Sequence, residues 1–393
     1  MSELKRRVQV EIDLQALVRN YRKIVAHVKP MKVLCVLKAN AYGLGVGAYA
    51  KALAEAGCTM FGVAEPYEAL ELKKCLGERA SRPFKAGQRE TGKMPVLPDI
   101  QILSSVLPDE IPEMVKAGVI LPITDIEEAK LVSAAAVKAK KTARVHFKLD
   151  TGMGRLGILA KDALAVIREV KRLPNLDCEG IFSHCPMAYD PSNTFTEDQM
   201  DLFEAILKDV AKSGITFKVV HIAASDAINN FPRAARAPFT QVRTGINLHG
   251  SFDPNGKRAL KVESVLTLKT RVAQVRDLLA GTTLGYGRTW CLNKTTRVAT
   301  ISAGYADGLP LALTNRGHVL IKGVACPVIG RISMDYTTVD VSRVPDVVPG
   351  DEVVCLGKDG RLQVTPDDWG VLKGTHAYEI ICSMGNRVAR VYV

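Results

Sequence analysis

The sequence predicts an α/β chain that begins as a (β/α)8 barrel of the TIM type and continues into a mostly-β C-terminal domain. Between residues 33 and 243, short runs rich in Val, Ile and Phe recur eight times, each followed by a helix-sized segment. From about residue 262 the pattern changes to strands separated by turns. The 393 residues, 47% of them hydrophobic, are enough for two cores. We therefore place the barrel at 10–262 and the β-rich domain at 263–393, which an N-terminal strand at 1–9 could join.

The barrel region opens with a helix signal. Asp13 can cap a helix whose apolar residues recur at helical spacing, namely Leu14, Leu17, Tyr21, Ile24 and Val28. The expected strands follow at 33–37, 60–64, 100–104, 119–123, 144–149, 179–183, 218–223 and 241–243. Eight such units fit a closed barrel better than an open sheet. A basic stretch rich in Gly and Pro at 79–98 interrupts the series, and we expect it to be a mobile surface insertion.

The second region shows strand-like runs with few helices between them. These runs lie at 265–272, 297–301, 319–321, 337–341, 352–356 and 387–393. Strands joined by turns are typical of an independent β-rich domain.

Composition excludes several classes of protein. The net charge of +12 is dispersed, without a basic block or recognised motif beyond Lys138-Ala-Lys-Lys141, so we expect no nucleic-acid partner. No run of 18 apolar residues exists and the N-terminus lacks an apolar signal segment, so we expect a cytoplasmic protein without a membrane partner. The nine cysteines are odd in number and scattered, which favours reduced thiols over disulfides or a zinc site; we expect no metal.

Lys38 is the most unusual strand end in the chain. It closes the apolar run 33–37 and is followed by small residues up to Gly45. A lysine with its stem in a nonpolar wall deprotonates more easily, and a neutral amine is what covalent chemistry with a carbonyl compound requires. The alternative is a lysine that extends its amine to solvent, as most do.

The other strand ends also carry polar groups. In a barrel, functional groups lie at the C-terminal ends of the strands. Beyond Lys38, those ends hold Tyr42, Lys148, Arg155, His184, His221, Ser225 and Arg243. Lysine, arginines, histidines and a serine beside glycines describe a site for a planar, phosphorylated, anionic ligand.

Seven motifs along the chain together resemble the alanine racemases, pyridoxal-phosphate enzymes of fold type III. The motifs are Leu37-Lys-Ala-Asn-Ala-Tyr-Gly43, Lys148-Leu-Asp-Thr-Gly-Met-Gly-Arg-Leu-Gly157, Phe182-Ser-His184, Val242-Arg-Thr-Gly-Ile246, Gly285-Tyr-Gly287, Gly304-Tyr-Ala-Asp-Gly308 and Gly330-Arg-Ile-Ser-Met-Asp335. The resemblance runs from about Val10 to the C-terminus, apart from 79–98. It implies interconversion of L- and D-alanine, which supplies D-alanine for peptidoglycan, with pyridoxal 5′-phosphate as cofactor.

The resemblance also implies two catalytic residues. Lys38 would bind the cofactor covalently and act as one acid/base group at the substrate Cα, and Tyr286 would act from the opposite face. Racemisation needs two such groups, because a single group returns the proton to the side it left. Tyr286, Tyr305 and Met334 would reach the barrel mouth of a second subunit, which implies a homodimer with shared active sites.

The remaining site residues follow from the same resemblance. Arg243 would face the pyridine nitrogen and keep it largely unprotonated. His184 would pack against the ring and, with Arg243, form the relay that allows Tyr286 to act as a base. The phosphate would be held by Tyr42, Ser225, Gly245 and Ile246. Arg155, Met334 and Tyr305 would contact the amino-acid substrate, and Lys148 corresponds to a lysine that is carbamylated in some relatives.

Two positions depart from the family pattern. Ala224 stands where an asparagine is frequent, and Asn386 aligns with a tyrosine that reaches the phosphate in some relatives. Both changes would remove polar contacts, so we expect somewhat weaker cofactor retention and altered substrate tolerance.

Three alternatives stay open. The enzyme could be a broad-spectrum or serine racemase, since a pocket that excludes one extra group discriminates by only ~1 to 3 kcal/mol. A pyridoxal-phosphate carrier without enzymatic activity would lack the β domain, so Gly285-Tyr-Gly and Ser333-Met-Asp disfavour it. A fold type III decarboxylase would place an acid at the pyridine nitrogen, which Arg243 disfavours, although Cys355 and Cys382 leave a cysteine available near the C-terminal end.

Overall fold

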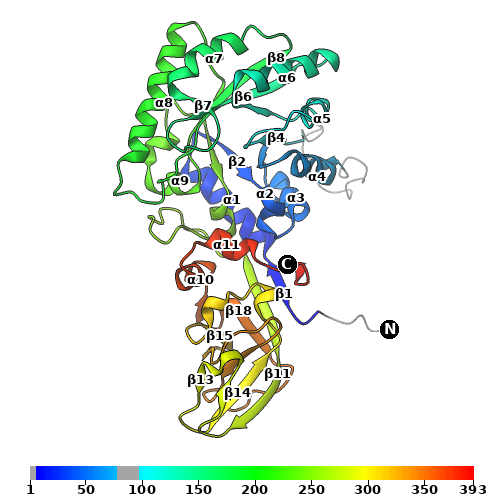
Figure 1. Ribbon diagram of the computed structural model, residues 1–393, viewed down its shortest axis with the longest axis vertical. Helices are drawn as coiled ribbons and strands as arrows, with labels where there is room; N and C mark the ends of the chain where they lie inside the picture. The colour runs from blue at the N-terminus through cyan, green and yellow to red at the C-terminus, as the bar shows by residue number, and fades with distance from the viewer. Residues whose placement is uncertain (1–5, 78–96) are drawn as a thin grey trace.

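The computed structural model describes residues 6–77 and 97–393. The insertion predicted at 79–98 lies outside these ranges, apart from its last two residues. The chain forms two bodies, an upper α/β body and a lower body of strands (Figure 1).

Each of the eight predicted barrel strands overlaps an observed one. They are β2 (Lys32–Val36), β3 (Met60–Val63), β4 (Asp99–Ile102), β5 (Leu121–Ile123), β6 (Ala143–Asp150), β8 (Leu176–Phe182), β9 (Val219–His221) and β10 (Gln241–Thr244). They are parallel and run in the orders β10-β2-β3-β4 and β5-β6-β8-β9, with the short β7 (Ile158–Leu159) beside β6.

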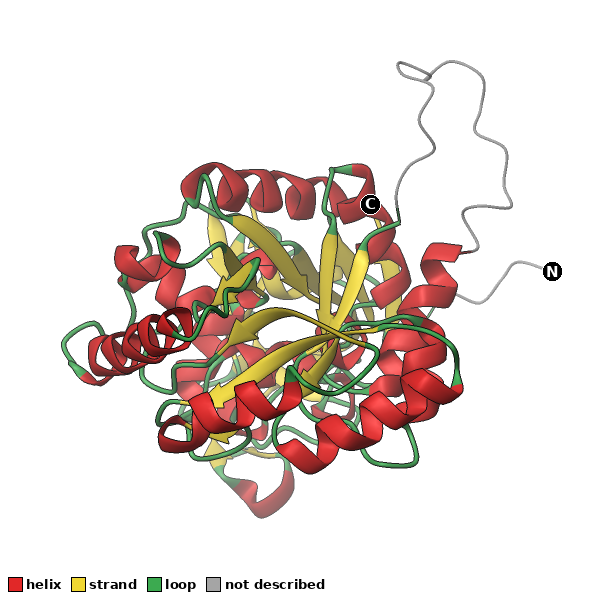
Figure 2. Ribbon diagram, turned by 90° about the horizontal axis from the view of Figure 1, so that it is seen from above, coloured by secondary structure: helices red, strands yellow, loops and turns green. Residues whose placement is uncertain are grey.

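Hydrogen bonds link these two groups of strands at both edges. The Ile120 amide, just before β5, donates to the Ile100 carbonyl of β4 at 2.8 Å. At the other edge, the Arg243 amide of β10 donates to the Ala223 carbonyl, just beyond β9, at 3.0 Å. The strands therefore follow one another in a ring with helices outside it, as predicted for a (β/α)8 barrel (Figure 2).

The outer layer contains the helices that follow the strands. They are α1 (Leu14–His27), α3 (Val46–Glu55), α4 (Pro66–Gly77), α5 (Ile111–Ala117), α6 (Ile126–Lys138), α7 (Ala163–Val170), α8 (Phe195–Lys212) and α9 (Ser225–Asn230), with 3-10 turns η1 (Ala160–Asp162), η2 (Pro232–Ala235) and η3 (Ile246–His249). Asp13 caps α1 as predicted, because its carboxylate accepts a hydrogen bond from the Ala16 amide at 2.8 Å.

The lower body is built around the long strand β11 (Leu266–Leu278). The other strands are β12 (Thr283–Leu284), β13 (Trp290–Cys291), β14 (Thr296–Ile301), β15 (His318–Ile321), β16 (Val324–Pro327), β17 (Thr337–Asp340), β18 (Glu352–Asp359), β19 (Leu362–Val364) and β20 (Ala389–Tyr392). Strand β1 (Gln9–Ile12) joins this sheet, antiparallel to β11 and parallel to β20. The short turns are η4 (Tyr286–Arg288), η5 (Tyr305–Asp307) and η6 (Leu311–Leu313).

Two helices near the C-terminus bring the chain back to the barrel. They are α10 (Pro366–Lys373) and α11 (Ala377–Cys382), and α11 lies against α2 (Lys38–Tyr42) (Figure 1). One continuous cluster of buried apolar side chains runs through both bodies, and a small separate cluster contains Leu284, directly before the Gly285-Tyr286 turn.

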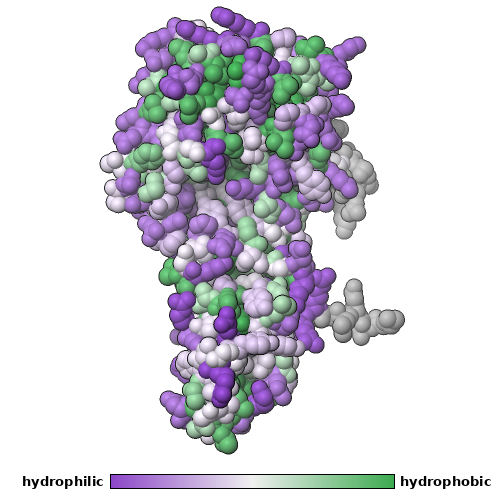
Figure 3. All heavy atoms as spheres, viewed as in Figure 1, coloured by the Kyte–Doolittle hydropathy of each residue, from purple (hydrophilic) through white to green (hydrophobic). Residues whose placement is uncertain are grey.

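The surface mixes polar and apolar residues. On the face seen in Figure 3, hydrophilic and hydrophobic side chains are interspersed over both bodies. Within the described ranges, no helix combines the length and the apolar character needed to cross a bilayer.

Candidate active site

The chain leaves β2 in an unusual backbone conformation. Ala39, Asn40, Ala41 and Tyr42 all have positive φ angles, between 52° and 59°. Because a left-handed conformation costs roughly 1–2 kcal/mol for a residue with a Cβ, the surroundings must hold this turn. The Asn40 side chain does so by accepting a hydrogen bond from the Val46 amide at 2.7 Å. The turn places Lys38 and Tyr42 together at the end of the barrel.

One cavity of about 1060 Å³ receives the polar side chains from the strand ends. Its lining includes the predicted residues Lys38, Tyr42, Lys148, Arg155, His184, Ser225, Arg243 and Gly245. Ile246 follows Gly245 and is fully buried, so its side chain does not line the cavity. The strand ends therefore meet at one common cavity, although His221, also at a strand end, is fully buried and does not line it.

Arg243 is buried in the cavity wall, and no carboxylate from residues 6–77 or 97–393 pairs with it. Its guanidinium donates to the Ser183 and Ile222 carbonyls at 2.8 and 2.9 Å. It also contacts His221 Nδ1 at 2.6 Å and His184 Nδ1 at 3.3 Å. Burial lowers the pKa of Arg243 to about 10, which leaves it a cation and a donor at neutral pH.

The pKa values of the cavity's basic groups are lowered by burial and by their neighbours. Lys38 is exposed as a whole residue, but the protein around its amine displaces water, and this desolvation and then Arg155 lower its pKa. Burial and then Arg155 lower the pKa of Lys148 to about 8. Burial and Arg243 lower the pKa of His184 to about 3. Lys38 and Lys148 therefore release a proton more readily than lysines in water, and His184 is neutral.

A loop curled around Asp150 carries Arg155 to the cavity. The Asp150 carboxylate accepts hydrogen bonds from the amides of Gly152 at 2.8 Å and Arg155 at 3.2 Å. This arrangement turns the chain sharply after β6, and Arg155 lines the cavity beside Met153 and Leu156.

One wall of the cavity is lined by hydroxyl groups. The Gly245 amide donates to Ser225 Oγ at 3.0 Å, and a Cβ at position 245 would collide with the Tyr42 hydroxyl. Tyr378, on α11, lines the same wall; its ring lies 6.0 Å from that of Tyr42, and a hydrogen bond links its side chain to Ser225. Three hydroxyls therefore converge beside a glycine.

Tyr378 is a site residue that the sequence analysis did not identify. The alignment placed Asn386 where relatives have a tyrosine near the phosphate, and this placement is wrong. Asn386 is exposed and is absent from the cavity lining, whereas Tyr378 is half-buried and lines the cavity. The signal available in the sequence was Tyr378 itself, an aromatic residue two positions after His376 and directly before Glu379. Ala224 does line the cavity next to Ser225.

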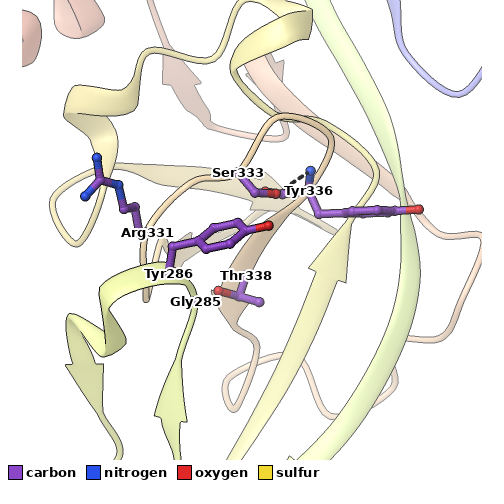
Figure 4. A pocket seen from close by; sticks show the side chains of 6 residues that line it. All are labelled: Gly285, Tyr286, Arg331, Ser333, Tyr336 and Thr338. Atoms are coloured by element: carbon purple, nitrogen blue, oxygen red, sulfur yellow. Dashed lines mark hydrogen bonds between the residues drawn. The ribbon is translucent and has the colours of Figure 1, made fainter.

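Tyr286 lies outside this cavity, in the β body. It is 74% exposed and lines a second cavity of about 350 Å³ with Gly285, Arg331, Ser333, Tyr336 and Thr338 (Figure 4). Tyr305 and Met334 are also exposed, on neighbouring loops joined by a hydrogen bond from the Tyr305 amide to the Ser333 carbonyl at 3.0 Å. Within one copy of the described chain, these three residues do not line the cavity of Lys38.

Comparison with known proteins places the whole chain in one family. Models of the alanine racemase N-terminal and C-terminal domains match residues 12–253 and 265–392. The alanine racemase of Halothermothrix orenii is 34% identical over 385 residues, covering 97% of this chain and 96% of that protein. The alanine racemase of Syntrophobacter fumaroxidans is 36% identical over 379 residues, covering 96% and 95%.

Solved structures give the same result. Alanine racemase from D-cycloserine-producing Streptomyces lavendulae has a TM-score of 0.88 and 32% identity, covering 100% of this chain and 98% of that one. Alanine racemase from Bartonella henselae, solved with covalently bound pyridoxal phosphate, has a TM-score of 0.85 and 29% identity, covering 99% and 100%. These matches cover both domains and confirm the predicted fold, so the chain belongs to the alanine racemase family.

Proposed function

We propose that this protein interconverts L-alanine and D-alanine with pyridoxal 5′-phosphate as its cofactor, and so supplies D-alanine for peptidoglycan. The observation that carries the proposal is one cavity that joins Lys38, whose pKa is lowered, to the buried Arg243, whose partners in the described chain include no carboxylate. The family membership supports the same activity.

The residues of the cavity fit this cofactor. A phosphate group could accept hydrogen bonds from the hydroxyls of Ser225, Tyr42 and Tyr378. Gly245 has no Cβ, and so it does not collide with the Tyr42 hydroxyl. Lys38 supplies an amine to the same cavity, and Arg243 supplies a hydrogen-bond donor. When bound, the cofactor would supply an electron sink that weakens the Cα–H bond of the amino acid.

The protein's own groups would then move the proton. Lys38 would take or return it on one face of Cα, aided by its lowered pKa, and Tyr286 would do so on the other. Arg243 can only donate hydrogen bonds, so it would leave the pyridine nitrogen unprotonated and the sink weak. In this way Arg243 would favour prompt return of the proton to Cα. Arg155 would orient the substrate carboxylate.

A direct assay tests this function. The purified protein is mixed with pyridoxal 5′-phosphate, reduced with borohydride, and digested to locate the labelled lysine by mass spectrometry. We expect the label on Lys38 and D-alanine formation from L-alanine, with serine and lysine turned over more slowly. Labelling without turnover of any amino acid would contradict a racemase and favour a carrier, and faster serine turnover would favour the broader racemase.

We also propose a homodimer with shared sites. Tyr286, Tyr305 and Met334 are exposed on the β body and do not line the Lys38 cavity of their own chain within the described ranges. A second copy would bring them to that cavity. Dissociation should therefore abolish activity.

Mixing two inactive variants tests the shared site. Lys38→Ala and Tyr286→Phe subunits are unfolded together and refolded. If the sites are shared, half of the random dimers regain one intact site, which restores about a quarter of the wild-type activity. Each variant refolded alone is the control, and mixtures no more active than those controls would contradict the shared site.

Lys148 is a candidate for carbamylation, which requires a neutral amine. It is buried, donates to the Leu103 carbonyl at 2.6 Å, and its pKa of about 8 makes the neutral form accessible. A carbamate there would supply a negative charge to Arg155. We place the enzyme in the cytoplasm, since Cys35, Cys178 and Cys355 are buried thiols rather than disulfides.

A further inference from the structure

Beneath the cavity, the interior of the barrel contains a layer of polar side chains. Side chains alternate along a strand, so a residue two positions before a cavity residue faces the same side. Gln101, His146 and Gln241 stand in this relation to Leu103, Lys148 and Arg243, and all three are fully buried. Barrel interiors are usually filled by bulky apolar residues, so a polar layer calls for a reason.

The packing leaves room for one of these residues. A Cβ at Gly180 would lie 2.6 Å from the His146 ring, so only glycine on β8 admits that ring into the interior. The His146 and His221 ring centroids are 6.0 Å apart, with an interplanar angle of 65°. The two rings therefore face each other edge to face across the interior.

The hydrogen-bond partners determine where each ring carries its proton. Arg243 can only donate, so His221 Nδ1 accepts its hydrogen bond at 2.6 Å, and the His221 proton must be on Nε2. On the other ring, His146 Nε2 lies 3.2 Å from a Glu179 carboxylate oxygen, which accepts. His146 Nδ1 is then the free acceptor of a neutral ring.

The charges around the rings agree with these assignments. Burial alone would raise the pKa of Glu179, but hydrogen bonds from His146 and Arg144 lower it to about 2, so Glu179 is ionised. Burial lowers the pKa of both His146 and His221, so both rings are neutral at pH 7.

The two ring nitrogens that remain are complementary. His221 Nε2 is a donor and His146 Nδ1 an acceptor, and both are buried without a hydrogen-bond partner in the part of the chain that the structure describes. The side-chain amides of Gln101 and Gln241 are unpartnered in the same sense. Leaving a buried polar group unsatisfied costs about 1–3 kcal/mol, and a buried water typically makes two to four hydrogen bonds in such a place.

We propose that ordered water binds in this polar layer and completes a hydrogen-bonded chain from Arg243 through His221, water and His146 to Glu179. His146 and Glu179 are then positioning residues for Arg243, a role that rests on the function proposed above for Arg243. Every hydrogen bond in the chain is donated in the direction from the cavity toward the Glu179 carboxylate. This common direction keeps His221 Nδ1 unprotonated, as the acceptor that Arg243 requires.

The far end of the chain is held by an ion-pair cluster at the base of the barrel. Arg144 Nη2 lies 2.9 Å from the Glu179 carboxylate, and Arg144 Nη1 lies 2.6 Å from Asp99. In the described part of the chain, Asp99 bonds to Arg144, whereas His146 bonds to Glu179 and not to Asp99. This difference provides a matched control.

The first test concerns the wild-type protein and is independent of its activity. A crystal structure should show water within hydrogen-bonding distance of both His221 Nε2 and His146 Nδ1. Solid-state 15N NMR of histidine-labelled protein should show both rings neutral and protonated on Nε2. An interior without water, or His221 protonated on Nδ1, would overturn the proposal.

The second test compares two isosteric variants. Glu179→Gln lets an amide donate to His146 and so disturbs the chain, whereas Asp99→Asn weakens only the Arg144 pair. We expect Glu179→Gln to lower kcat about tenfold with KM within about twofold, and to change the His221 15N signals. Asp99→Asn should leave kcat and the His221 signals unchanged. Equal effects of both variants, or unchanged His221 signals in Glu179→Gln, would show a purely structural role and overturn the assignment.

The two tests also separate this proposal from the proposed function. If the protein racemised no amino acid, the water and the histidine protonation states would still test the chain. If alanine were racemised while either of those observations failed, the function would stand and the chain would not.

Discussion

The barrel and the β body present their reactive groups in opposite ways. In the barrel, Arg243 and Lys148 are enclosed, bonded to backbone carbonyls, and shifted in pKa by burial. In the β body, Tyr286 projects from a turn at 74% exposure. An enclosed group can be tuned by its own chain, whereas an exposed group acquires a defined environment only when another surface covers it. The Lys38 cavity should therefore bind the cofactor within one chain, whereas Tyr286 of the β body should contribute only in the assembled protein.

The largest effect should come from the barrel lysine. Lys38→Arg keeps a positive charge but removes the amine that would bind the cofactor, so we expect kcat to fall by at least ~10⁴-fold. Borohydride should no longer label the protein. Lys32→Arg, at the exposed start of β2, is the control and should leave kcat unchanged. Substantial activity in Lys38→Arg would contradict the role of Lys38.

The next effect tests the β body. Tyr286→Phe removes one hydroxyl and should lower kcat about 10²- to 10⁴-fold, the usual contribution of a general acid or base, while cofactor affinity stays unchanged. Deuterium incorporation from solvent at Cα should then become strongly unequal between the L and D substrates.

A matched tyrosine provides the control for this variant. Tyr67 on α4 is 73% exposed, like Tyr286, so Tyr67→Phe should have no effect on either measurement. If Tyr286→Phe weakened cofactor binding while kcat at saturating cofactor stayed normal, the separation of tasks between the two bodies would be wrong.

Adding a methyl group at a tightly packed glycine, one in the barrel and one in the β body, tests the same difference between the two bodies. Gly245→Ala would push a methyl group against the Tyr42 hydroxyl, and we expect the cofactor dissociation constant to rise about 100-fold. Gly285→Ala, at φ 70° and with its Cβ 2.9 Å from the Arg331 amide, should lower kcat by displacing Tyr286 without changing cofactor affinity. Fluorescence titration and kinetics measure both, and an equal loss of cofactor affinity in the two variants would contradict the comparison.

The smallest effect concerns how tightly the barrel cavity is closed. Burial, and then Asp253, raise the pKa of Asp226 from 3.8 to about 6. Between pH 3.8 and pH 6, Asp226 is more often protonated in the folded protein than in the unfolded chain. The free energy of unfolding therefore falls as pH rises through this range, and the full loss of stability is present above pH 6. Asp226→Asn should therefore raise the free energy of unfolding by about 2 kcal/mol at neutral pH and have little effect near pH 4.

Urea unfolding at the two pH values measures this gain. Asp162→Asn, at an exposed position on η1, should show no difference between them. A gain of equal size for Asp226→Asn at both pH values would mean that the carboxylate is not held in a low-polarity wall.

The repeated βα pattern made the barrel predictable. Alternation of apolar runs and helix-sized segments located all eight strands, because each strand is buried on both faces and so reads as a short apolar run. Strand ends then predicted the common cavity, since parallel strands deliver their last residues to one edge. The α1 cap at Asp13 was equally visible, because it depends on one local hydrogen bond.

Features imposed by distant contacts could not be predicted in this way. The left-handed run from Ala39 to Tyr42 contains no glycine, and its conformation depends on partners such as Asn40 and Val46 in the folded chain. Tyr378 enters the cavity only because α11 folds back against the barrel. The approach of His146 to His221 depends on the missing side chain of Gly180, which leaves room for the His146 ring.

The pairing of β1 has a consequence for biosynthesis. Gln9 lies between Lys269 of β11 and Ala389 of β20, so a strand made early is completed by one made 380 residues later. During translation the barrel segments emerge in order and can associate, whereas β1 must wait with an unpaired edge. The β body should therefore acquire resistance to proteases only after β20 has left the ribosome, and ribosome-bound chains of increasing length would reveal that delay.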